Sequence, residues 1–95
     1  MSRAADRVLA DVRQISEKLP FVVKTEFWLS PNDDAPGHIH FKFFVEGDRD
    51  HALDRLIQDM TPVEVRQDRV EVDFVVLEPE YAGHIGGKTL FTRSE

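Results

Sequence analysis

The sequence predicts an α+β domain in which an antiparallel four-stranded sheet packs on two helices, as a two-layer sandwich with the element order α-β-β-α-β-β. Two segments, about 3–18 and 48–60, space their apolar residues three or four positions apart, as one face of a helix requires. Three others, 21–30, 38–46 and 63–77, alternate apolar and polar residues, as strands with one buried face do. The 95 residues fit a single domain with one core.

The first helix is expected to bury a stripe that includes Val8, Val12 and Ile15. Ser2 is the expected N-cap, since a serine hydroxyl can accept a hydrogen bond from the first turn. Pro20 is expected to end the helix, because a proline disfavours helical backbone at the residue before it.

The first two strands are expected to pair as an antiparallel hairpin. The preferred register places Phe27 opposite Phe41. It also places Glu26 opposite Lys42, which brings opposite charges together. The alternative register would place Lys24 opposite Lys42 and is disfavoured for that reason.

The second helix is expected over about residues 48–60. Asp48 or Asp50 can cap its first turn, where a negative charge also favours the positive end of the helix dipole. The dipeptide Thr61-Pro62 is expected to end it.

The segment after the second helix alternates, but its phase changes in the middle. Odd-numbered valines are followed by even-numbered apolar residues: Val63, Val65, Val70, Val72, Phe74 and Val76. A strand with one buried face cannot change parity without a bulge. The sequence therefore predicts either a hairpin turning at Asp68-Arg69 or one bulged strand.

The domain proper is assigned to residues 1–80, and residues 81–95 to a Gly-containing C-terminal tail that is expected to be mobile. Within this tail, Leu90-Phe91 is apolar enough to add a short edge strand. Residues 82–89 approach the P-loop pattern, with Ala82 in place of the first glycine. A P-loop needs a helix after its lysine, and the few residues that follow do not provide one, so no nucleotide or other cofactor is expected.

Composition limits the partners. Lys and Arg number 12 and Asp and Glu number 18, giving a formal net charge of -6. This balance argues against nucleic acid and against anionic membrane surfaces, both of which attract basic proteins. The absence of cysteine excludes disulfides and thiolate metal sites. No segment has the pattern of a signal peptide or the apolar length of a membrane span, so the expected location is the cytoplasm.

The sheet face turned away from the helices is predicted to carry an unusual mixture of side chains. Its apolar members are Val22, Trp28, Phe44, Val75 and Leu77, and its polar members are Lys24, Glu26, His38, His40, Lys42, Glu71 and Asp73. Exposed apolar patches often mark partner surfaces, and Trp is enriched at binding hot spots. The other interpretation is that the tail or the sheet twist covers these residues.

The favoured function is a non-enzymatic interaction or regulatory module that self-associates through this face as a homo-oligomer, with Trp28 at the contact, or that binds another protein. The alternative is a small enzyme or ligand-binding protein with a pocket at the sheet face or a subunit boundary. In that case His38, His40 and Glu26 are the candidate polar groups for a small molecule. No catalytic motif is present, so no catalytic residue is assigned.

His38 and His40 form an H-x-H pair whose imidazoles lie on the same side of a strand. Two ligands do not make a metal site, and a third must come from elsewhere in the chain. The residues considered for that role are Asp33, Asp34, His51 and His84. Asp33 and Asp34 are near the pair and His51 and His84 are distant, but no motif fixes a third ligand, so no metal is predicted.

Overall fold

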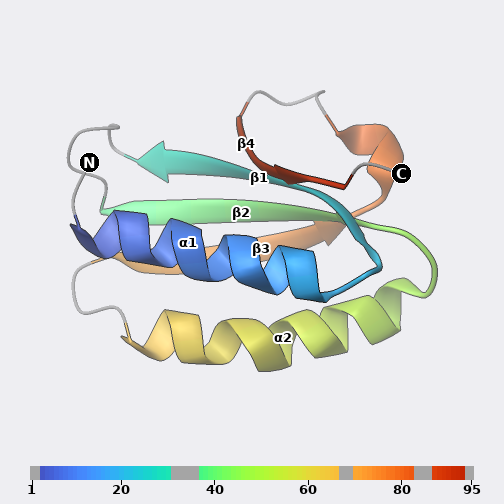
Figure 1. Cartoon of the computed structure of the whole chain (residues 1–95), viewed down its shortest axis with the longest axis horizontal. Coiled ribbons are helices and arrows are strands. Elements are labelled where there is room, and N and C mark those ends of the chain that lie inside the picture. The colour runs from blue at the N-terminus through green and yellow to red at the C-terminus, as the bar shows by residue number, and fades with distance from the viewer. Residues whose placement is uncertain (1–2, 31–36, 67–69, 83–86, 94–95) are drawn as a thin grey trace.

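The computed structural model describes residues 3–30, 37–66, 70–82 and 87–93. In chain order, the elements are α1 (Arg3–Lys18), β1 (Val22–Ser30), β2 (His38–Val45), α2 (Arg49–Arg66), β3 (Glu71–Leu77), the 3₁₀ turn η1 (Pro79–Tyr81) and β4 (Lys88–Thr92) (Figure 1). The predicted α+β class, with two helices and four strands, is confirmed.

The four strands form one sheet in the order β3-β2-β1-β4, and both helices lie on the same side of it (Figure 1). Helix α1 contacts β1 and β4, whereas α2 contacts β3, and the two helices contact each other. The inner face of the sheet is thus covered, and the outer face is turned away from the helices. Neither described helix combines the length and the apolar character that crossing a membrane requires.

The sheet is mixed, and the prediction of a purely antiparallel sheet is wrong. Strand β1 pairs antiparallel with both β2 and β4, but β2 and β3 run parallel. The reason is the connection between them. Helix α2 carries the chain back along the sheet, and such a crossover makes the next strand parallel to the previous one.

Helix α2 continues to Arg66 with Pro62 in its interior, whereas the sequence predicted an end at Thr61-Pro62. The buried stripe explains the difference, because Val63 follows Met60 at helical spacing and is 2% exposed. Packing of this extra turn outweighs the backbone hydrogen bond that proline cannot donate.

The longer helix also resolves the change of phase between residues 63 and 77. Val63 belongs to α2, and the even-numbered Val72, Phe74 and Val76 pack against the core from β3. Neither the predicted hairpin nor the bulged strand forms. The proposed turn at Asp68-Arg69 includes residues outside the described ones.

The N-cap of α2 is Asp48, which was one of the two predicted alternatives. Its Oδ1 accepts hydrogen bonds from the backbone N–H groups of Asp50, at 3.0 Å, and His51, at 3.2 Å. These bonds satisfy donors that a helix start leaves without a partner. The N-cap predicted for α1, Ser2, lies outside the described residues.

The register predicted for the first hairpin is confirmed. Phe27 pairs with Phe41, and Glu26 pairs with Lys42. Alternation of apolar residues fixes which face is buried, and the charge pairing selects between the registers that alternation permits.

An irregularity near the start of β1 changes the face to which Val22 belongs. The pairing shifts between Val22 and Lys24, and Val22 pairs with Val45 of the inner face. A bulge of this kind adds a residue to one strand and reverses the direction of the side chains beyond it. Val22 is therefore fully buried in the core, and its predicted place on the outer face is wrong.

One buried polar contact joins the two layers. The hydroxyl of Ser16, on α1, donates to the carbonyl of Val12 at 2.9 Å and lies 2.7 Å from the hydroxyl of Thr25, on β1. Both side chains are fully buried, and each hydroxyl has a partner inside the core.

The C-terminal segment completes the sheet. The optional edge strand at Leu90-Phe91 is present as part of β4. Just beyond it, Arg93 donates hydrogen bonds to the carbonyls of Ser16 at 2.8 Å, Leu19 at 3.0 Å and Val22 at 2.9 Å. The first two carbonyls lie at the end of α1, where a positive charge and additional donors are favourable.

Candidate functional site

One end of the outer sheet face is covered. Phe44 is fully buried, although it lies apart from the core between the sheet and the helices. It pairs with Leu77, the last residue of β3, and η1 follows directly and contacts β2. The predicted exposure of Phe44 is therefore wrong, because the chain folds over this end of the outer face after β3. Leu77 itself is half-buried.

Two residues of the predicted apolar set, Trp28 and Val75, stay at the surface. Trp28 is 43% exposed and Val75 is 51% exposed. The Lys42 ammonium lies 4.1 Å from the centre of the Trp28 ring, within the range of a cation–π contact. Gly87 lies against the same indole, since a Cβ at this position would come within 3.3 Å of Trp28 Nε1. The C-terminal segment thus covers part of Trp28 but not all of it.

Glu26 lies on the outer face yet is only 4% exposed. Its carboxylate is 3.1 Å from the Lys24 ammonium, and its strand neighbours are Lys42 and Thr89. A buried carboxylate requires such a positive partner. Glu26 is therefore part of the packing of the sheet and is poorly placed to bind a small molecule.

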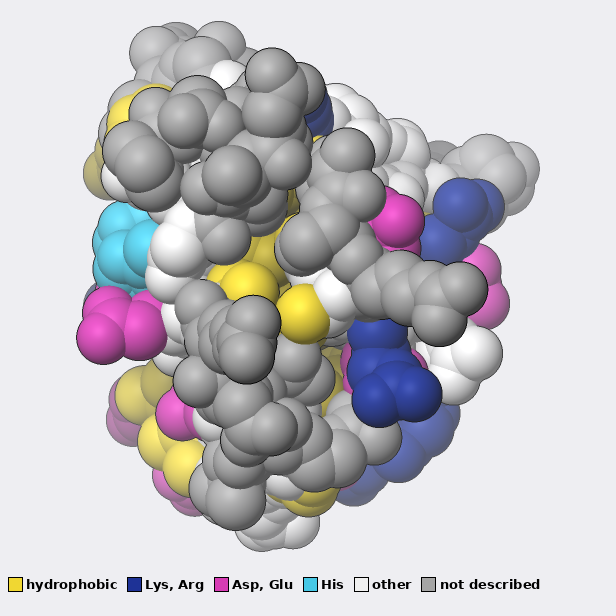
Figure 2. Space-filling view, turned by 90° about the vertical axis from the view of Figure 1, so that its left-hand side faces the viewer, with side chains coloured by type: hydrophobic (Ala, Val, Ile, Leu, Met, Phe, Trp, Pro, Cys, Tyr) yellow, Lys and Arg dark blue, Asp and Glu magenta, His cyan; other side chains and the backbone are white. Residues whose placement is uncertain are grey.

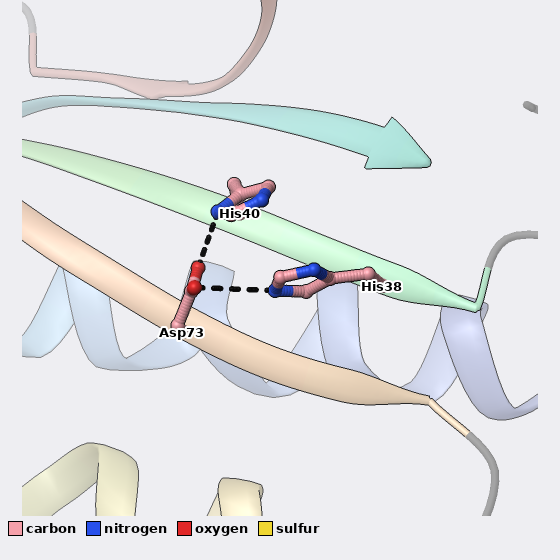
Figure 3. Close-up of side chains that lie close together, drawn as sticks. All are labelled: His38, His40 and Asp73. Atoms are coloured by element: carbon pink, nitrogen blue, oxygen red, sulfur yellow. Dashed lines mark ion pairs between the residues drawn. The ribbon is translucent and has the colours of Figure 1, made fainter. Parts of the chain in front are cut away.

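His38, His40 and Asp73 come together on the outer face. The two imidazoles project from β2 toward the carboxylate from β3 (Figure 3). His38 Nε2 is 3.2 Å from Asp73 Oδ2, and His40 Nδ1 contacts Asp73 Oδ1. One candidate ligand atom from each of the three lies within 4.8 Å of the others. The side chains are accessible, and Figure 2 shows histidine beside acidic side chains at the surface.

The sequence placed Asp73 on this face but did not single it out as a partner of the histidines. The pairing of His40 with Asp73 depends on the parallel alignment of β2 and β3, which was not predicted. Of the other residues considered as ligands, His51 lies on α2, where its ring contacts Phe21. Asp33, Asp34 and His84 are outside the described residues.

A shallow hollow of about 270 Å³ adjoins the cluster. Its lining includes Trp28, His40, Lys42, Asp73 and Val75. The hollow therefore combines an aromatic ring, a positive charge, the edge of the histidine cluster and an exposed valine on β3.

The outer edge of β3 has no partner strand among the residues that the structure describes, since β3 ends the sheet. The Glu71 N–H donates to the Gly37 carbonyl at 2.9 Å and so points toward β2. In a parallel pair, successive residues point their N–H and C=O groups alternately toward and away from the neighbouring strand. The backbone groups of Val72, Phe74 and Val76 accordingly point away from β2.

Helix α2 adds apolar surface beside this edge. Leu53 is 38% exposed and Ile57 is 48% exposed. The opposite flank of α2 faces α1, where Asp59 lies 3.4 Å from Lys18. By helical spacing, Leu53 and Ile57 lie on the flank away from α1, which is the flank toward the β3 edge.

A second polar feature lies on η1. The Glu78 carboxylate, through a hydrogen bond and its negative charge, raises the pKa of Glu80 above its ordinary value, with a smaller contribution from burial. Arg49 lies 3.9 Å from Glu78. These side chains are exposed and line an open hollow of about 360 Å³, so they are a surface charge cluster.

The comparisons with known proteins give no further guide to the site. No protein-family model, curated protein or solved structure matches the chain.

Proposed function

We propose that the chain is a non-enzymatic interaction module that forms a homodimer through the outer edge of β3. The observation that carries the proposal is this seven-residue edge strand. Exposed apolar side chains lie beside it both on the outer face of the sheet and on the helix layer. An edge strand usually avoids unwanted pairing through a proline, charged side chains, especially lysine, or a short length. Strand β3 has no proline and no lysine, and its two charged residues, Glu71 and Asp73, lie in its first half.

This proposal keeps the self-association expected from the sequence but moves its centre. The covered Phe44 and the partly covered Trp28 leave less apolar surface on the outer face than the sequence predicted. Val75, the more exposed of the remaining apolar residues there, lies on β3 itself. The apolar surface therefore gathers at the edge strand.

Strand geometry limits the registers that a symmetric dimer can use. In an antiparallel pair across a two-fold axis, the residues that exchange hydrogen bonds must be those whose backbone groups point outward. These are Val72, Phe74 and Val76. Centring the axis on Phe74 pairs all seven residues of β3 with their symmetry mates and uses all three outward residues.

The charges on β3 agree with that register. With the axis at Phe74, Asp73 lies opposite the partner's Val75, and Glu71 lies opposite the partner's Leu77. An axis at Asp73 would place two aspartates opposite each other, which is unfavourable. An axis at Val75 avoids this repulsion but pairs fewer residues.

The helix layer contributes to the same contact. Leu53 and Ile57 flank the β3 edge on the inner side, and the two-fold axis brings the same residues from the second copy toward them. Val75 contributes on the outer side. Apolar burial on both layers then accompanies the backbone hydrogen bonds, as a stable interface requires.

The first test is the native mass in solution, measured by light scattering on a sizing column at micromolar concentration. The wild-type chain is expected to have twice the mass of one chain. Val75→Asp places an aspartate opposite the partner's Asp73, and Ile57→Lys introduces a charge into the helix layer of the proposed contact, so both variants are expected to give monomers. Trp28→Lys is the matched control, because β1 is two strands away from the interface, and it is expected to remain dimeric.

A monomeric wild-type chain contradicts the proposal. A dimer that Trp28→Lys dissociates, while Val75→Asp does not, would place the contact on the outer face instead of the edge. Circular dichroism of each variant establishes that the fold is retained.

A second pair of variants distinguishes the contribution of backbone hydrogen bonding at the β3 edge from that of side-chain packing. Val72→Pro removes an N–H group that points outward and leaves the hydrogen bonds to β2 in place. Val72→Ala matches the loss of the side chain but keeps the N–H group. The proline variant is expected to weaken the dimer much more than the alanine variant, and equal effects would show that edge pairing is not used.

The alternative, a small-molecule site on the outer face, has weaker support. The hollow beside the histidines has a volume of about 270 Å³, just below the roughly 300–1,000 Å³ of typical ligand pockets. The buried Glu26 is also unavailable as a polar contact.

A further inference from the structure

We infer that His38, His40 and Asp73 form a binding site for one divalent transition-metal ion of the zinc type. This site goes beyond the proposed dimer, because all three side chains project from the outer face of a single chain (Figure 3). A monomer and a dimer would therefore both bind the metal. The inference rests on the ligand types, their separations and the way in which the sheet holds them.

The separations fit a shared ion. Two ligand atoms at about 2.0–2.2 Å from a tetrahedral ion are roughly 3.3–3.6 Å apart. His38 Nε2 and Asp73 Oδ2 are 3.2 Å apart, and one ligand atom from each of the three side chains lies within 4.8 Å of the others. Small side-chain rotations bring three ligand atoms around one ion without moving the strands.

The sheet fixes the direction of the ligands. His38 and His40 alternate along β2 with Ile39 and Phe41, which are 0% and 1% exposed. Because these two residues are anchored in the core, the histidines must point outward. The parallel register then pairs Asp73 with His40. A site built on two hydrogen-bonded strands loses less conformational entropy on binding than one built on loops.

The ligand set selects the class of ion. Two imidazoles and one carboxylate suit Zn²⁺, Co²⁺, Ni²⁺ and Cu²⁺ better than the hard ions Mg²⁺ and Ca²⁺, which prefer oxygen. Three protein ligands leave one position for water or for another molecule. Glu71 pairs with His38 on the same face and offers a further carboxylate beside the site.

Some nearby charges oppose the binding of a cation and others favour it. Lys42 lies on the same face, and its positive charge disfavours a cation, although its ammonium is held over the Trp28 ring. Asp73 and Glu71 contribute negative charge, and the chain as a whole has a formal net charge of -6. The local and overall negative charges therefore favour the cation.

The test is calorimetric titration of the chain, without a histidine tag, with Zn²⁺. Binding of one ion per chain is expected. His40→Gln and Asp73→Asn each remove one ligand with little change in shape, and each is expected to weaken affinity at least about tenfold, since even outer-shell changes cost 10–100-fold. His51→Gln is the matched control and is expected to bind like the wild type.

A second readout locates the ion. Zn²⁺ is expected to shift the imidazole NMR signals of His38 and His40 and to leave those of His51 unchanged. Co²⁺, bound at the same site, is expected to show the visible absorption of a tetrahedral complex.

Two results overturn the inference. One is the absence of binding at millimolar Zn²⁺, which leaves the three residues as a hydrogen-bonded cluster only. The other is binding that His40→Gln and Asp73→Asn do not weaken, which would show scattered association with the acidic surface. Neither result bears on the dimer, whose mass measurement is made without added metal.

Discussion

Replacing Arg93 tests whether the C-terminal segment is an integral part of the fold. Its guanidinium donates hydrogen bonds at 2.8–3.0 Å to three carbonyls, two of them at the end of α1. It also lies 5.0 Å from the Phe91 ring. In Arg93→Ala these carbonyls lose a charged donor, and the end of the C-terminal segment loses its hydrogen bonds to the end of α1.

The magnitude follows from the number of bonds and their partial exposure. Hydrogen bonds to a charged group contribute about 1.5–3 kcal/mol each when buried. Water can replace some of these bonds, so we expect a total loss of about 2–4 kcal/mol rather than the full sum. For a domain of this size, 1 kcal/mol corresponds to about 4–8 °C, so Tm is expected to fall by roughly 8–32 °C.

The assay is thermal unfolding followed by circular dichroism, with urea unfolding for the free energy. Arg93→Lys keeps the charge but not the fork of donors, and it is expected to give an intermediate loss. Arg13→Ala is the matched control, because Arg13 is exposed and its ion pair among the described residues is with Glu17, one turn away. If Arg93→Ala unfolds within about 2 °C of the wild type, the contact of Arg93 with α1 does not contribute to stability.

Two further predictions concern a buried hydroxyl pair and an acidic pair. Ser16→Ala leaves the Thr25 hydroxyl buried without its partner and is expected to lower the free energy of unfolding by about 1–3 kcal/mol. The double variant Ser16→Ala with Thr25→Val is expected to recover most of that loss. Urea unfolding measures this coupling, and additive losses from the two single variants would contradict it. Glu78→Gln is expected to lower the pKa of Glu80 toward its ordinary value, as measured by NMR titration. The raised pKa means that Glu80 holds its proton more firmly in the folded chain, so its stabilising contribution is present at low pH and is lost as the pH rises through the carboxyl range. This loss of stability is expected to be smaller in Glu78→Gln. An unchanged pKa of Glu80 would exclude Glu78 as the cause.

Local patterns predicted much of the fold. Alternation and one charge pair were sufficient for the register of Phe27 with Phe41, because the information lies within two adjacent strands. Pro62 predicted a helix end that does not form, because packing of Val63 outweighs the local effect of proline. The change of parity at Val63 was a usable signal, since Val63 continues the stripe of Met60.

The candidate site depended on information that local patterns lack. Alternation placed Phe44 on the outer face, but its burial arises where the chain folds over this face after Leu77. Asp73 joins His40 only because β2 and β3 are parallel, and that topology follows from the crossover through α2. The ligand types were visible in the sequence, whereas their proximity required the topology.

The position of β1 has a consequence for how the chain reaches this structure. Its two neighbours are β2, which follows directly, and β4, which begins only at Lys88. During synthesis, β1 therefore has one unpaired edge until nearly the whole sequence shown here has been made. An open apolar strand edge is prone to association with other chains. A chain that is interrupted before β4 is thus expected to aggregate or be degraded rather than to persist as a smaller domain.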